Sequence, residues 1–264
     1  MYGNFQLRYS AKLILIVSIL CVSSYCHAGT EIVSSVCTYR YTQRSILING
    51  HPTPVEYYQP DGPGPFPLVF MLHGSAGAFS LKSSDEPLVD NFGEKALARS
   101  CFAVVLPHYL EALGYKSITS QQDMALHFPD MLAITDSLLT HAESLPVVKG
   151  RPVFLFGESL GGYLSVALGL RRKEVRALSE ISGGVPTGYA IDNPHNVALL
   201  ISHGADDTLV APQSAEDLKQ YCLDHHLKVE MNLYPGVGHY LPRTIEAKCI
   251  ATTVEFFLNH LHGG

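Results

Sequence analysis

Six short apolar runs, separated by segments of helix length, constrain the fold of this 264-residue chain more than any other feature. Each run has four or five residues and almost no charge, as expected of strands buried on both faces of a parallel sheet. The runs are 68–72, 102–106, 153–156, 177–181, 197–201 and 229–233. Alternation of buried strands with helices predicts right-handed crossover connections and helices on both faces of the sheet.

The segments between these runs have helical character, and the N-terminal part of the chain is rich in strand-forming residues. Residues 37–48 and 54–59 are predicted to be strands, with Asn49-Gly50 as the turn between them. The expected helices are 91–99, 124–141, 161–171, 214–225 and 244–260. No repeat or composition shift divides the sequence, so we expect an α/β fold with one mostly parallel central sheet, in a single domain over 29–264.

Residues 1–28 have the pattern of a signal peptide. Arg8 and Lys12 form a positive start, and an apolar run follows over 13–22. Cys26 and Ala28 are small residues at the two positions that a signal peptidase reads, so we expect cleavage after Ala28. An uncleaved anchor is the alternative, but a membrane span needs about 20 apolar residues. We therefore expect a secreted or periplasmic protein with no stable membrane insertion after cleavage.

Charge and histidine spacing narrow the range of partners. Residues 1–28 contain two of the 18 basic residues and no acidic one, which leaves 16 basic against 24 acidic residues and a formal net charge of −8. Because neutralising phosphates requires clustered Lys and Arg, this balance disfavours nucleic acid as a partner. The 13 histidines do not cluster at metal-ligand spacing. Nothing argues for a metal, and no cofactor is expected.

Four cysteines follow the predicted cleavage site, namely Cys37, Cys101, Cys222 and Cys249. An even number of cysteines in an exported chain predicts two disulfides, for which three connectivities are possible. We favour the pairs Cys37–Cys101 and Cys222–Cys249. The alternative is that the cysteines are buried free thiols.

A serine between two glycines follows the apolar run 153–156 directly. The sequence Gly157-Glu158-Ser159-Leu160-Gly161 lies between that expected strand and an expected helix, which is the pattern of a nucleophile elbow. Such a turn strains the serine backbone and projects the hydroxyl above the sheet, over the positive end of the helix. Ser159 is therefore the candidate nucleophile, and an ordinary glycine-rich loop is the alternative.

An acid and a histidine follow two later strands. The order serine, acid, histidine is the one found in hydrolases that carry this turn. Asp206 and Asp207 come just after the run 197–201, and His239 lies in a glycine-rich loop after the run 229–233. Carboxyl ends of parallel strands share one rim of a sheet. We expect His239 to accept the serine proton and one of the two aspartates to orient the imidazole.

The loop after the first apolar run is the candidate for an oxyanion hole. Such a hole takes one backbone N–H from the residue after the nucleophile and another from the loop after an earlier strand. His73-Gly74-Ser75 follows the run 68–72. We assign the N–H groups of Ser75 and Leu160 to the hole. A simple tight turn at His73-Gly74 is the alternative reading.

Together these motifs resemble the α/β-hydrolase superfamily and, within it, the dienelactone-hydrolase-like branch. The matching segments are 67–77, 157–162, 204–210 and 234–239. The resemblance covers most of the chain from about Pro54 onward and implies the α/β-hydrolase fold. Lids in this fold usually follow the strand that corresponds to 177–181. The segment 182–196 is short, so the resemblance implies no substantial lid and an open site.

The resemblance also bears on the acid and on the reaction. Related enzymes have a glycine, an acid three positions later and a valine three positions after that; Gly204, Asp207 and Val210 fit, which favours Asp207 over Asp206. Dienelactone hydrolase itself has a cysteine at the elbow, where this chain has Ser159. The difference favours an ordinary esterase.

Aromatic residues after the run 102–106 are candidates for substrate binding. Tyr109 and Tyr115, with Leu110 and Phe128, are placed to line an acyl or alcohol pocket, and local packing is the alternative. The leading hypothesis is a serine carboxylesterase that cleaves small or medium soluble esters through an acyl-enzyme. The alternatives are a thioesterase or peptidase with the same triad, and a non-catalytic binding module on a hydrolase scaffold.

Overall fold

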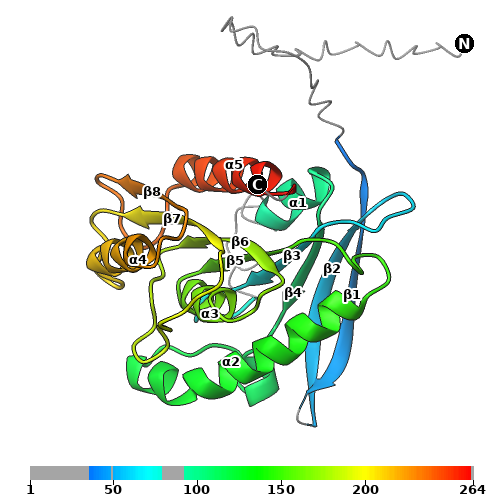
Figure 1. Ribbon diagram of the computed structural model, residues 1–264. Coiled ribbons are helices and arrows are strands. Elements are labelled where there is room, and N and C mark those ends of the chain that lie inside the picture. Colours follow the sequence, from blue (N-terminus) through cyan, green and yellow to red (C-terminus); the bar gives the residue numbers. More distant parts are fainter. Residues whose placement is uncertain (1–35, 49, 79–91, 263–264) are drawn as a thin grey trace, which may run out of the picture. The chain divides into compact units, whose positions relative to one another are not determined.

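In the computed structural model, which describes residues 36–48, 50–78 and 92–262, eight strands form one sheet in the order β1-β2-β4-β3-β5-β6-β7-β8 (Figure 1). The strands are β1 (Tyr39–Ile48), β2 (His51–Pro60), β3 (Leu68–Leu72), β4 (Ala103–Pro107), β5 (Val153–Glu158), β6 (Val175–Ile181), β7 (Ala198–Gly204) and β8 (Val229–Tyr234). Strands β3 to β8 are parallel, whereas β1 pairs with β2, and β2 with β4, in the antiparallel sense. The predicted signal peptide lies outside the described residues.

Helices cover both faces of this sheet, as predicted. They are α1 (Phe92–Arg99), α2 (Gln121–Ser144), α3 (Leu160–Gly169), α4 (Gln213–Asp224) and α5 (Arg243–Asn259), with a short 3-10 helix, η2 (Glu111–Leu113). Helices α2, α3 and α4 lie on one face, and α1 and α5 on the other (Figure 1). Because strand side chains alternate, Phe70 of β3 packs toward α2 and its neighbour Met71 toward α5.

The longest helix, α2, extends beyond the predicted 124–141 at both ends. It begins early because the Ser120 side chain accepts a hydrogen bond from the backbone N–H of Asp123 at 3.2 Å and so caps the helix. No helix interrupts the segment 182–197 between β6 and β7, in agreement with the expected lack of a lid there. Among the described residues, no helix combines the length and apolar character needed to cross a membrane.

One of the two favoured disulfides is confirmed and the other is wrong. Cys37 and Cys101 are bonded, with their Cα atoms 5.3 Å apart. Cys222 and Cys249 are free and buried. Cys222 on α4 belongs to the core on one face of the sheet and Cys249 on α5 to the core on the other, so the sheet separates the two thiols. Burial raises the pKa of the Cys222 thiol to about 12.

Candidate active site

Ser159 lies at a sharp turn between β5 and α3. Its φ of 53° and ψ of −118° are strained for a residue with a Cβ. The Ser159 N–H donates to the carbonyl oxygen of Ile181 at 2.8 Å, which ties the turn to β6. A Cβ at Gly161 would lie 2.0 Å from the carbonyl oxygen of Leu72, so only glycine lets α3 start this close to β3. The turn therefore has the geometry of a nucleophile elbow.

Ser159, His239 and Asp207 form one hydrogen-bonded chain at the carboxyl edge of the sheet. Ser159 Oγ lies 3.1 Å from His239 Nε2, and His239 Nδ1 lies 2.7 Å from Asp207 Oδ2. Because an ionised carboxylate only accepts hydrogen bonds, Nδ1 is the protonated nitrogen. The lone pair on Nε2 is then available to the serine hydroxyl.

Asp207 is buried and surrounded by donors. Its Oδ1 accepts from the N–H groups of Leu209 and Val210, both at 2.9 Å. Burial opposes ionisation, but the donors Val210, His239 and Leu209 outweigh it and lower the pKa of Asp207. Asp206, the alternative acid, has an exposed side chain. The aspartate that contacts His239 is thus the one that the resemblance favoured.

The loop that carries His239 is tied to the loop that carries Asp207. The Asp206 N–H donates to the carbonyl oxygen of Val237 at 2.9 Å. A Cβ at Gly204 would lie 2.3 Å from that same oxygen, so a larger residue at 204 would push the two loops apart. The glycine three residues before the acid therefore sets the distance between Asp207 and His239.

His203 is a contact of Asp207 that the sequence analysis missed. It is completely buried at the end of β7. Its Nε2 lies 3.0 Å from the carbonyl oxygen of Val210 and 3.4 Å from Asp207 Oδ2. Because both oxygens only accept, Nε2 carries a proton and donates. A histidine two residues after an apolar run and four residues before an acid was the available signal.

Two hydrogen bonds to consecutive carbonyls fix the loop after β3. The Tyr109 hydroxyl donates to the His73 carbonyl oxygen at 2.7 Å, and His73 Nδ1 donates to the Gly74 carbonyl oxygen at 2.8 Å. In a planar trans peptide the N–H points away from the preceding carbonyl. These bonds therefore set the directions of the Gly74 and Ser75 N–H groups. A Cβ at Gly74 would lie 3.5 Å from Ser159 Cβ, so the loop runs beside the serine.

The two tyrosines named as candidates for substrate binding differ in exposure. Tyr109 is completely buried, and its ring stacks on His73 with centroids 4.2 Å apart. Its side chain supports the loop from within the core, which is the local-packing alternative. Burial lowers the pKa of His73 to about 4, so this imidazole is neutral. Tyr115 is half-buried, and its hydroxyl lies 3.0 Å from His127 Nε2.

Two exposed apolar side chains flank the hydrogen-bonded chain. Tyr240 is 82% exposed, and its ring stands edge-on to His239 with centroids 5.5 Å apart. Leu209, just after Asp207, is 54% exposed. No group of three or more metal-ligating side chains occurs in the part of the chain that the structure describes.

A second buried carboxyl lies one strand away from the serine. Glu180 of β6 is completely buried, and its Oε2 accepts from the Gly183 N–H at 2.6 Å. Its Oε1 has no hydrogen-bond partner among the described residues. Burial raises the pKa of Glu180 to about 8, because the hydrogen bond from Gly183, which lowers the pKa, only partly offsets the effect of burial. The sequence analysis did not single out this residue.

The strand order, the elbow and the loops at the carboxyl edge of the sheet define an α/β hydrolase. The sequence agrees with a narrower assignment. The model of the Dienelactone hydrolase family matches residues 56–247, and the chain belongs to that family.

The chain is also similar to curated proteins and to solved structures. "Probable feruloyl esterase C" of Aspergillus niger is 30% identical over 151 residues, which are 57% of this chain and 52% of that protein. The same description belongs to a protein of Aspergillus oryzae that is 28% identical over 148 residues, 55% of this chain and 50% of that protein. The chain thus spans about half the length of the curated relatives it matches.

A solved structure of a putative dienelactone hydrolase from Klebsiella pneumoniae matches with a TM-score of 0.63 and 16% identity, over 86% of this chain and 100% of that one. Est1E from Butyrivibrio proteoclasticus matches with a TM-score of 0.60 and 17% identity, over 86% and 99% of the two chains. Likeness at this identity is likeness of fold, and it confirms the expected α/β-hydrolase architecture.

Proposed function

We propose that this protein is a carboxylesterase that uses Ser159 as nucleophile, His239 as general base and Asp207 as the group that orients the histidine. The observation that carries the proposal is the 3.1 Å contact between Ser159 Oγ and the accepting nitrogen of His239. Membership of the dienelactone hydrolase family and the similarity to probable feruloyl esterases support an ester as the bond that is cleaved.

In the first half of the reaction Ser159 Oγ attacks the ester carbonyl carbon, and its proton passes to His239 Nε2. The oxyanion that forms accepts hydrogen bonds from the backbone N–H groups of Leu160 and Ser75. Asp207 stabilises the imidazolium. When the C–O bond to the alcohol breaks, the leaving oxygen takes the proton from Nε2, and the acyl group remains esterified to Ser159.

In the second half water replaces the alcohol. His239 Nε2 takes a proton from the attacking water, whose oxygen bonds to the acyl carbon. The same two N–H groups stabilise the second oxyanion. The bond to Ser159 Oγ then breaks, the serine recovers its proton from Nε2, and the free acid leaves.

His73 and Tyr109 act in this scheme as positioning residues. The hydrogen bonds to the carbonyls of His73 and Gly74 restrain the directions of the Gly74 and Ser75 N–H groups, and the proposal requires the Ser75 N–H to face the serine. A peptide flip in this loop would turn a carbonyl oxygen toward the oxyanion instead. Because the imidazole of His73 is neutral, it places no positive charge beneath the hole.

The substrates in this proposal are small or medium soluble esters, with aromatic groups favoured. The lack of a helix over 182–197 supports access by soluble substrates. The exposed ring of Tyr240 beside His239 offers a surface for stacking an aromatic ring. Tyr115 is proposed as a further contact at the rim of the site.

The proposed place of action is outside the cytoplasm, either secreted or periplasmic. The disulfide between Cys37 and Cys101 supports this, because such bonds persist in oxidising compartments. The pattern of residues 1–28 gives the same indication.

Labelling with a fluorophosphonate probe tests the proposal. The wild-type protein and the Ser75→Ala variant, which keeps its backbone N–H, should both be labelled, and Ser159→Ala should not. Wild-type protein that is not labelled would indicate a binding module, whereas labelling that is lost only in Ser159→Ala supports an enzyme. Faster turnover of the thioester or amide than of the matched ester would instead support the alternative enzyme classes.

A further inference from the structure

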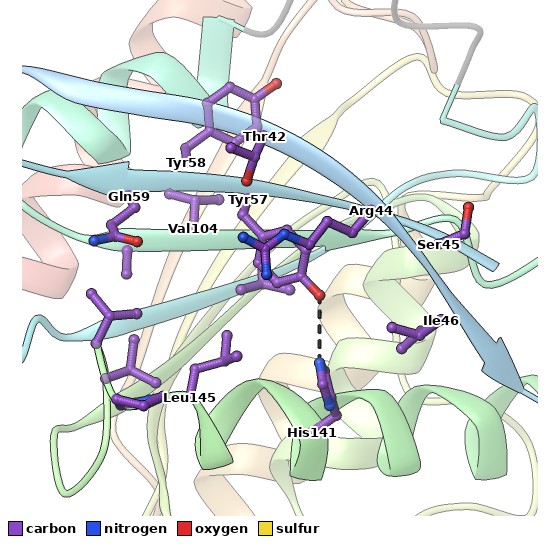
Figure 2. Close-up of a pocket in the computed structure, with 15 residues that line it drawn as sticks. Thr42, Arg44, Ser45, Ile46, Tyr57, Tyr58, Gln59, Val104, His141 and Leu145 are labelled. Atoms are coloured by element: carbon purple, nitrogen blue, oxygen red, sulfur yellow. Dashed lines mark hydrogen bonds between the residues drawn. The ribbon is translucent and has the colours of Figure 1, made fainter.

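A cavity of about 490 Å³ lies between the β1–β2 hairpin and the C-terminal end of α2 (Figure 2). Cavities of about 300–1,000 Å³ accommodate small ligands. Its lining includes Ala103, the first residue of β4. Ser159 follows the last residue of β5. Because β4 and β5 both run parallel to β3, this cavity is at the opposite end of the strands from the candidate active site.

The cavity exists because α2 ends before it can cover the hairpin. Helix α2 stops at Ser144, and Leu145 turns the chain away toward β5. Strands β1 and β2 pair over ten residues each, whereas β2 pairs with β4 only over Val55–Tyr58. The hairpin therefore extends beyond β4, and the sheet continues past the end of α2. Beyond the last turn of α2, the face of the hairpin on the α2 side is therefore left without a helix over it among the described residues.

The interior of the cavity is apolar. Val105 of β4 and Val148, which precedes β5, are each only 3% exposed and form part of the lining. Leu145 and Val147 are partly buried and pack against the same core. These side chains offer a surface for an alkyl or aryl group.

The rim is polar and carries positive charge. The Tyr57 hydroxyl lies 3.5 Å from His141 Nε2, and the Arg44 side chain lies beside this pair (Figure 2). Burial raises the pKa of the Tyr57 hydroxyl, and the positive charge of Arg44 partly opposes this rise. The Arg44 guanidinium is therefore close enough to interact electrostatically with the hydroxyl. Among the described residues, no Asp or Glu lines the cavity. Arg172, by contrast, contacts Asp136, Glu143 and Glu174.

We infer that this cavity binds a monocarboxylate with an apolar tail. The carboxylate lies against the Arg44 guanidinium, which can donate two parallel hydrogen bonds, and accepts a further one from the Tyr57 hydroxyl. The tail lies on Val105, Leu145 and Val148. A guanidinium without an acidic partner in the described chain, in a protein of formal net charge −6, is suited to an anion that comes from solution.

Binding is measured on the full chain carrying Ser159→Ala, so that the result does not depend on ester hydrolysis. The probes are octanoate and 3-phenylpropanoate, with octanamide as the uncharged control. Calorimetry should show binding of one or both acids, and Arg44→Gln should weaken it by about tenfold or more. Arg40→Gln is the matched control, because it removes the same charge from the same strand at a residue outside the lining.

Amide chemical shifts locate the bound acid. Shifts confined to 42–46, 57–59 and 141–148 support the inference. Two results would overturn it: equal affinity in Arg44→Gln and in the parent, or shifts centred on Ser159 and His239. Octanamide that binds as tightly as octanoate would also overturn it, since the carboxylate would then contribute nothing. If wild-type protein supplied with an ester shows the same amide shifts, the acid released by hydrolysis is a source of the ligand. If the shifts appear only when free acid is added, the ligand comes from solution and not from the reaction.

Discussion

Asp207 and Glu180 are both buried carboxyls at the carboxyl edge of the same sheet, yet their pKa values move in opposite directions. Asp207 accepts from two backbone N–H groups and from His239, with His203 close by. Within the part of the chain that the structure describes, Glu180 accepts from Gly183 alone. Burial raises the pKa of both carboxyls, so the number of hydrogen-bond donors decides which of them is ionised.

The comparison shows how one edge of a sheet keeps one acid charged and its neighbour protonated. The two backbone donors to Asp207 come from the turn 207–210, which folds back on the carboxylate. Glu180 lies within β6, where the backbone N–H groups are engaged by neighbouring strands. A carboxylate in a loop can accept from several N–H groups of its own segment, whereas Glu180 in a central strand accepts from one, that of Gly183 just past the strand end.

The largest expected effect is on kcat, and it distinguishes Asp207 from Glu180. Asp207→Asn should lower kcat by about 10⁴-fold, because the amide cannot hold His239 in the tautomer that accepts the serine proton. Glu180→Gln should keep activity within a few-fold of wild type, since Glu180 contacts neither Ser159 nor His239. Initial rates on a short-chain aryl ester give both values. Asp206→Asn is the control and should be mild; a severe loss in that variant would make Asp206 the acid.

A smaller effect is expected from removing the hydrogen-bond donor to a backbone carbonyl in the loop after β3. Tyr109→Phe removes the donor to His73 and should lower kcat by about tenfold, less than the 10²–10³-fold typical of losing an oxyanion donor outright. KM should change little, because the loop acts on the transition state. Unchanged kcat would show that the Tyr109 hydroxyl does not position the loop. Tyr115→Phe is the control at the rim and should leave kcat near wild type.

The smallest effect concerns stability and pH. The pKa of Glu180 rises from its ordinary 4.5 to about 8 in the folded protein. Between these values the unfolded chain loses a proton that the folded chain keeps, so the free energy of unfolding falls as pH rises, by up to about 1.4 kcal/mol per pH unit. Glu180→Gln should flatten this slope in denaturant titrations between these pH limits. Glu216→Gln, exposed on α4, is the control, and an unaltered slope in Glu180→Gln would contradict the comparison.

Local sequence patterns predict most of the fold and the position of the candidate triad. The apolar runs match β3 to β8 to within a few residues, because a strand buried on both faces needs an unbroken apolar stretch. Ser159, Asp207 and His239 each follow the end of a strand, and parallel strands bring those ends together. These features depend on neighbours in the chain, so the sequence alone reveals them.

What could not be predicted depends on how side chains are buried and on which face of the sheet each element lies. Glu180 lies in the apolar run 177–181 and His203 two residues after the run 197–201, and the apolar pattern does not specify their contacts with Gly183 and Asp207. The pairing of Cys222 with Cys249 failed because no local pattern says which face of the sheet a helix covers. For Tyr109 the sequence left a pocket contact and local packing both open, because a buried ring and an exposed ring have the same local sequence signature.

The disulfide at the start of β1 makes the strength of this fold depend on its surroundings. Its two half-cystines are 64 residues apart. Closing a loop of that size restricts the unfolded chain by an amount equivalent to about 4 kcal/mol at room temperature. Where thiols are kept reduced, the polypeptide lacks this contribution and unfolds more readily. Oxidation then links the segment before β1 to the segment before β4 and makes the folded form more durable.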